Sequence, residues 1–182
     1  IILNIMITVL CVDDEPNILF LSKTFLEKTG DFVVDTAASA QEAQTFLKYN
    51  QYDVIISDYM MPVTDGLTFL KQLRKDGIQI PFILVSCRGQ EMAVVDAIND
   101  GLSGYVSKEG DPEYNFAMLS HRINQVVSLK RSEEGWKESE ERFKFLFTHM
   151  AEAVALFTFI NDDAGIPVDY LFEDINMRYE EI

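Results

Sequence analysis

Residues 53–66 of the 182-residue chain are DVIISDYMMPVTDG. The run Val54–Ile56 is short, apolar and β-branched, which is typical of a buried strand in a parallel sheet. Pro62 and Asp65-Gly66 follow it and predict a turn. Asp58 therefore stands at the tip of a buried strand, the edge where open α/β sheets carry their chemistry. A single acid at a strand tip is common, so its meaning depends on what the other strands deliver to the same edge.

Four further strand patterns alternate with helical patterns around this stretch. Apolar residues with helical spacing fill the intervals; Pro16 opens the first predicted helix, Gly30 ends it, and Ser39 begins a capping-box pattern. This alternation predicts a parallel sheet covered by helices on both faces. The four additional strands are expected at 6–12, 32–37, 81–85 and 104–106, with a helix through Met92, Val94, Val95 and Ile98 before the last of them.

Composition limits the classes of function. The formal net charge is −15, which argues against a nucleic-acid-binding surface because such surfaces need basic patches. Cys11 and Cys87 lack metal-type or disulfide-type spacing, which fits a reducing compartment. No segment has the length and apolar character of a membrane span. We therefore expect a cytoplasmic protein.

Polar side chains follow four of the predicted strands. If the sheet is parallel, Asp13, Asp14, Asp58, Ser86 and Lys108 emerge at one edge. Three carboxylates repel one another unless a cation neutralises them, and oxygen ligands of this kind favour Mg²⁺. An acid nucleophile, a divalent metal, a lysine and a hydroxyl together predict phosphoryl transfer.

These residues closely resemble the receiver domain of two-component response regulators. The resemblance rests on Asp13-Asp14, Asp58 with Pro62 and Asp65-Gly66, Ser86, Tyr105 and Lys108, in this order and at these spacings. It implies a flavodoxin-like five-stranded parallel sheet of strand order 2-1-3-4-5. It also implies that Asp58 receives a phosphoryl group from the phosphohistidine of a sensor histidine kinase or a phosphotransfer protein. In this fragment no conventional enzyme activity is expected beyond that self-catalysed chemistry.

The resemblance also assigns individual roles. Asp14, Asp58 and the backbone carbonyl of Met60 would ligate Mg²⁺, with Asp13 acting through water. Ser86 and Lys108 would contact the phosphoryl oxygens. Tyr105 would be an aromatic switch that turns inward when Ser86 moves, with simple packing as the alternative for this residue.

Two positions depart from the family's pattern. Glu109 follows Lys108 where the family usually has proline, often after a cis bond. A cis bond to a residue other than proline costs about 3 kcal/mol, so we expect a trans bond with a shifted loop, or a strained one. Cys87 stands where alanine is usual, and its larger side chain is expected to restrict access to Asp58.

The chain changes character after residue 128, which places the receiver at 6–128 and a linker or signalling helix at 129–144. Leu129, Trp136, Phe143 and Met150 recur every seven residues, but the companion positions hold Glu133 and Glu140. Two interpretations of this segment therefore remain, a solvated connecting helix and a coiled coil. Residues 145–182 resemble the N-terminal part of a PAS domain, through Glu138–Phe143, Leu146-Phe147, Ala153–Leu156 and Asn176. The expected parent is a longer receiver–PAS signalling protein or histidine kinase.

The expected output is conformational. Phosphorylation at Asp58 should remodel the face formed by residues 88–122, and we expect homodimerisation through that face, the linker helix, or both. One alternative is a pseudo-receiver that binds partners without taking phosphate. A weaker one is a phosphatase with an aspartate nucleophile, which would need a second aspartate where Met60 stands.

Overall fold

The computed structural model describes residues 6–87, 95, 97–150, 152–163, 165–176 and 178. The chain divides into two compact units, Ile1–Lys130 and Arg131–Ile182. Within the described residues, no helix combines the length and the hydropathy needed to cross a bilayer.

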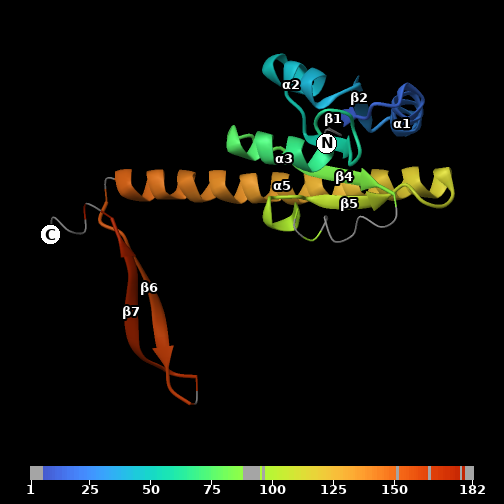
Figure 1. Cartoon of the computed structure of the whole chain (residues 1–182). Coiled ribbons are helices and arrows are strands. Elements are labelled where there is room, and N and C mark those ends of the chain that lie inside the picture. The colour runs from blue at the N-terminus through green and yellow to red at the C-terminus, as the bar shows by residue number, and fades with distance from the viewer. Residues whose placement is uncertain are drawn as a thin grey trace. The chain divides into compact units, whose positions relative to one another are not determined.

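The first unit contains a five-stranded parallel sheet of order β2-β1-β3-β4-β5 (Figure 1). The predicted strand order is confirmed. Asp58 is the last residue of β3 and pairs in register with Val85 of β4. The strands are β1 (Ile7–Val12), β2 (Phe32–Ala37), β3 (Val54–Asp58), β4 (Phe82–Ser86) and β5 (Gly104–Ser107).

The helices of this unit begin at local signals that the sequence contains. Pro16 occupies the first turn of α1. Ser39 Oγ caps α2 by accepting the N–H of Glu42, whereas the Glu42 carboxylate accepts the N–H of Ala38, one residue before the position that a strict capping box would use. Val95 and residues 97–99 are helical, whereas Met92 and Val94 lie outside the described residues. The other helices are α1 (Pro16–Lys28), α2 (Ala40–Tyr49), α3 (Gly66–Lys75) and α5 (Pro112–His149).

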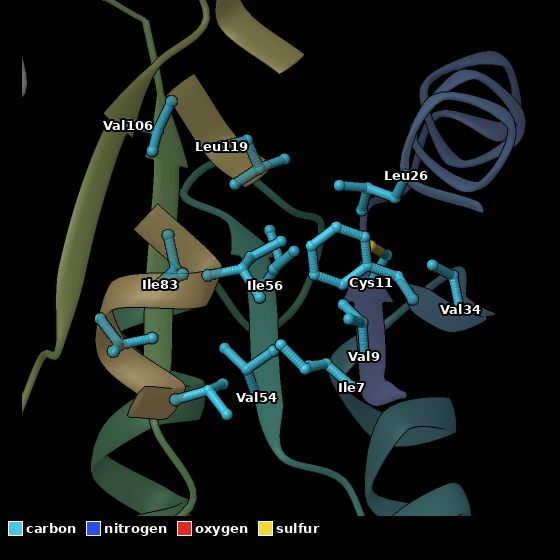
Figure 2. Close-up of a cluster of buried hydrophobic side chains, with 14 of the residues drawn as sticks. Ile7, Val9, Cys11, Leu26, Val34, Val54, Ile56, Ile83, Val106 and Leu119 are labelled. Carbon is cyan, nitrogen blue, oxygen red and sulfur yellow. The ribbon is translucent and has the colours of Figure 1, made fainter. Parts of the chain in front are cut away.

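Alternate residues of the central strands bury two apolar clusters, one on each face of the sheet. Val9 and Cys11 of β1 face a cluster that includes Leu26 of α1 and Leu119 of α5 (Figure 2). The opposite cluster joins other strand residues to side chains of α2 and α3. α1 and α5 thus cover one face and α2 and α3 the other, as the predicted doubly covered sheet requires.

α5 runs as a single helix from Pro112 to His149, and the division between the two units falls inside it. The sequence predicted a linker helix over 129–144, and α5 extends beyond it in both directions. The helix is continuous because no proline interrupts it after its first residue, Pro112. Residues 88–94 and 96 of the predicted partner face lie outside the described residues.

The second unit contains an antiparallel hairpin of β6 (Ala155–Asn161) and β7 (Pro167–Ile175). Every residue of β7 is exposed. Asn176 is buried beside the hairpin, where its backbone and side chain form hydrogen bonds with Val154 and its side-chain amide donates to Glu152 O. Residues 151, 164, 177 and 179–182 of the predicted PAS segment lie outside the described residues.

Candidate functional site

Three acidic side chains meet at the carboxyl edge of the sheet. Asp13 and Asp14 follow β1 and Asp58 ends β3; one carboxylate oxygen from each lies within 4.8 Å of the others. Asp13 and Asp58 are buried, whereas Asp14 is exposed. Parallel pairing of β1 with β3 produces this meeting, as the sequence predicted.

Lys108 bridges two of these acids. Its Nζ lies 2.6 Å from Asp58 Oδ1 and 2.9 Å from Asp13 Oδ2. Burial acts to lower the pKa of Lys108, but the hydrogen bonds to Asp58 and Asp13 outweigh it and raise the pKa above its ordinary value. Lys108 is therefore a fixed positive charge at the edge.

Asp58 is held in a buried setting that is unfavourable to its charge. Burial raises the pKa of its carboxyl, the hydrogen bond and charge of Lys108 oppose that rise, and Asp13 adds to it; the pKa remains above its ordinary value. The N–H of Met60 donates to Asp58 Oδ2 at 3.0 Å. A cation beside Asp58 would relieve this repulsion between carboxylates.

Gly66 allows α3 to start against the backbone of Asp58. A Cβ at position 66 would lie 2.3 Å from the carbonyl oxygen of Asp58, so glycine is required by this close approach. Its N–H donates to Tyr59 O at 2.9 Å, and Asp65 caps the helix by accepting the N–H of Thr68. The sequence predicted a turn here but not the contact.

The peptide bond between Lys108 and Glu109 is trans, which resolves the two possibilities left open by the sequence. The loop still delivers Lys108 to the acids because both of its backbone polar groups are bonded: its N–H donates to Ser86 O and its carbonyl accepts from Asn115 Nδ2. Asn115 was not among the predicted site residues, because a polar residue in the first turn of a helix carries no distinctive signal in the sequence.

Ser86 and Tyr105 are brought together by the pairing of β4 with β5. Ser86 is buried, and its Oγ lies 3.2 Å from the Tyr105 hydroxyl and 3.2 Å from the carbonyl oxygen of Cys87. Tyr105 packs its ring against the apolar cluster under α2 and α3. The Cys87 side chain is exposed.

The donor set suits a hard divalent cation. Asp13, Asp14 and Asp58 offer oxygen atoms only, and three carboxylates against one lysine leave an excess negative charge of two. Mg²⁺ fits both the ligand type and this charge.

Comparison with known proteins agrees with this arrangement. The family described as "Response regulator receiver domain" matches residues 9–120. Response regulator Rre1 of Synechocystis is 38% identical over 137 residues, covering 74% of this chain and 59% of that protein. The chain spans about half to three fifths of the curated relatives it matches.

Solved structures give the same result. The receiver domain of Francisella response regulator 1452 has a TM-score of 0.61 and 31% identity, covering 68% of this chain and 98% of that one. The receiver domain of a signal transduction histidine kinase from Syntrophus aciditrophicus has a TM-score of 0.58 and 27% identity, covering 67% and 90%. The chain belongs to the response regulator receiver domain family of two-component signalling.

Proposed function

We propose that Asp58 is the phosphorylated residue of this receiver and that its donor is a phosphohistidine on a sensor histidine kinase or phosphotransfer protein. The observation that carries the proposal is the contact of Lys108 with both Asp58 and Asp13. This contact puts the nucleophile and a fixed cation within bonding distance of each other.

In the proposed reaction a carboxylate oxygen of Asp58 attacks the phosphorus atom in line while the bond from phosphorus to the histidine nitrogen breaks. The imidazole leaves with its electron pair and takes up a proton. Lys108 then exchanges its bond to Asp58 for one to a phosphoryl oxygen, and Ser86 donates its hydroxyl to another. Asp13, Asp14, Asp58 and the Met60 carbonyl would hold Mg²⁺, which supplies positive charge opposite the phosphoryl oxygens.

Tyr105 is the proposed switch residue. The Ser86 hydroxyl donates a hydrogen bond to the Tyr105 hydroxyl. If Ser86 donates to a phosphoryl oxygen instead, this bond to Tyr105 breaks and the Tyr105 side chain can move. Tyr105→Phe keeps the packing and removes the bond. If Tyr105 is a switch, this variant takes phosphate normally but loses the downstream response; if Tyr105 only packs, both are unchanged.

We propose that residues 129–144 relay the change to a PAS segment at 145–182 and that the active form is a homodimer. Support comes from exposed apolar residues that recur every seven positions, Leu129, Trp136 and Phe143 on α5 and Met150 just after it, and from the exposed hairpin beside Asn176. Trp136 is the only tryptophan of the chain, so its fluorescence reports on this stripe. Dimerisation through the stripe predicts a blue shift that grows with protein concentration and is enhanced by a phosphoryl mimic. A spectrum and a sedimentation coefficient independent of both would contradict it.

Incubation with acetyl phosphate and Mg²⁺ tests the phosphorylation site. Intact-mass analysis should show one added phosphoryl group, lost in Asp58→Asn and when EDTA replaces Mg²⁺. Asp76→Asn, which changes an exposed acid at the far end of α3, should behave like the parent.

The same experiment separates the alternatives. A pseudo-receiver would gain no mass and would not bind beryllofluoride, an analogue of the phosphoryl group. A phosphatase would turn over a phosphomonoester continuously. The presence of Met60 argues against this alternative, because a methionine side chain cannot act as the general acid.

A further inference from the structure

A pocket of about 200 Å³ lies in the first unit between α1 and the start of α5. Its walls are largely apolar and come from both helices and from four strands, β1, β3, β4 and β5. Cys11, Ile56, Val106 and Leu119 of these walls belong to the buried cluster drawn in Figure 2. Exposed Leu21 and Pro112 stand at its mouth. The pocket is thus a gap in a face of the core that is otherwise closely packed.

Ser22 places a hydroxyl in this apolar wall. The residue is only 9% exposed, and across residues 6–87, 95 and 97–150 no hydrogen bond to its hydroxyl is formed. A buried hydroxyl without a partner is unfavourable, and buried polar groups usually have one. Ser22 is therefore a free donor directed at the space between the helices.

The far wall of the pocket is fixed. Phe116 lines it and stacks on Phe25 of α1, with ring centroids 4.5 Å apart and planes within 6°. Leu19, Val106 and Leu119 are buried in the surrounding cluster. Because these side chains are held by their own packing, collapse of the wall into the gap is opposed.

Charge at the pocket selects against ionic ligands. Asp13, Asp58 and Lys108 also line the pocket, but the Lys108 ammonium group is already paired with both carboxylates. The two carboxylates repel an anionic ligand. The apolar walls make it unfavourable for any charged ligand to leave water and enter the pocket. An apolar cavity of about 150 Å³ is large enough to bind benzene, so this pocket has room for a single ring with a small substituent.

We infer that the receiver binds a small neutral molecule of single-ring size in this pocket, through apolar contacts and one hydrogen-bond acceptor facing Ser22. The pocket shares Asp58 and Lys108 with the proposed phosphoryl site but extends away from it between α1 and α5. Binding is tested on the unphosphorylated protein, so its outcome does not depend on whether Asp58 takes phosphate.

Two probes of nearly equal shape test the inference with the full chain. Acetophenone carries a carbonyl acceptor, and isopropylbenzene replaces that oxygen with a methyl group. In methyl-labelled NMR titrations both should shift the methyl signals of Leu19, Val106 and Leu119 saturably. Isopropylbenzene is the more hydrophobic probe, so the two affinities are compared after each is corrected for the probe's water-to-octanol transfer free energy. On this corrected scale acetophenone should bind roughly fivefold more tightly, the ratio expected for one net hydrogen bond.

Variants assign the effect to the pocket. Ser22→Ala should retain binding of both probes but abolish the preference for acetophenone. The matched control Thr24→Ala removes an exposed hydroxyl from the same helix and should leave the preference intact. Ser22→Leu should fill the gap and abolish binding of both probes; if it does not fold, the alanine variant alone decides. Equal corrected affinities of the two probes for the parent, no saturable shift, or a corrected preference that survives Ser22→Ala would each overturn the inference.

Discussion

Lys108 and Asp58 form a 2.6 Å ion pair across the sheet edge, although their strands are not neighbours and β4 lies between them. The Lys108 ammonium group also contacts Asp13, which follows β1. A single ammonium group therefore links the ends of β1, β3 and β5. Removing one partner of a buried pair leaves the other charged and unpaired. This cost, rather than the attraction itself, should dominate the effect of substitution.

Lys108→Met should therefore lower the free energy of unfolding by roughly 2 kcal/mol, because Asp13 and Asp58 lose their shared cation. Combining it with Asp58→Asn should reduce that loss, since only one carboxylate then remains unpaired. Urea unfolding followed by circular dichroism measures both. Lys144→Met, which removes an exposed pair with Glu140, should cause no measurable change. Equal losses in the two lysine variants would contradict the buried-pair account.

Asp58→Asn should stabilise the protein in EDTA and make it insensitive to Mg²⁺. Burial and Asp13 raise the pKa of Asp58, so its ionised form destabilises the fold at neutral pH, and a neutral amide removes that penalty. The parent should gain about 2.7 kcal/mol when Mg²⁺ reaches one hundred times its dissociation constant. Thermal unfolding with and without Mg²⁺ gives both results. A variant that responds to Mg²⁺ as the parent does would remove Asp58 from the metal site.

Local patterns in the sequence predicted most of the fold. Each strand is a short apolar run, and parallel pairing then brings Asp13, Asp58 and Lys108 together without further information. The approach of Gly66 to the Asp58 carbonyl was not predictable, because it depends on how α3 packs after the turn. The same holds for the bond from Asn115 to the Lys108 loop. Such contacts join residues whose spacing carries no periodic signal.

Two further features could not be predicted from the sequence: the length of α5 and the surroundings of Ser22. No turn signal marks the division of the two units at Lys130, because that division falls within a continuous helix. Ser22 lies among apolar residues of α1, and nothing in the sequence distinguishes it from an ordinary helix residue. Its importance depends on the empty volume opposite it, which only packing in three dimensions reveals.

Val63 should be a site of stored backbone strain. Its φ is +70° and its side chain is fully exposed, so a β-branched residue adopts the left-handed conformation without any packing in return. Val63→Asn should stabilise the protein by about 1 kcal/mol, because asparagine tolerates this conformation. Val63→Ala keeps a Cβ without that tolerance and should give a smaller gain. Chemical denaturation ranks the three proteins, and a loss of stability in Val63→Asn would refute the strain.

The two cysteines should differ sharply in reactivity. Burial raises the pKa of the Cys11 thiol to about 12, with Asp13 adding to the rise, so the thiolate that reacts is scarce at pH 8. Cys87 is exposed. Maleimide at pH 8 should therefore modify the folded protein once, at Cys87, and a second time only in denaturant. Mass analysis of Cys87→Ala should show no labelling in the folded state. The same variant tests whether Cys87 slows phosphorylation of Asp58, since equal rates in variant and parent would dismiss that prediction.

Arg74 should be more sensitive to conservative substitution than its position at the end of α3 suggests. Its guanidinium donates to three backbone carbonyls, those of Ile78, Ile80 and Gly101, at 2.6, 3.0 and 2.9 Å. These bonds tie the turn before β4 to the turn before β5. A lysine ammonium cannot span the same planar fork, so Arg74→Lys should leave at least one carbonyl unsatisfied and cost on the order of 2 kcal/mol.

The matched control for this prediction is Arg122→Lys, because Arg122 donates through its side chain to exposed Gln125. That variant should unfold at nearly the parent's urea concentration. Amide hydrogen exchange locates the effect: Arg74→Lys should speed exchange at Ile78 and Leu102, whose N–H groups are bonded within the two tied turns. If exchange accelerates uniformly over the sheet instead, Arg74 contributes general stability and does not specifically join the turns.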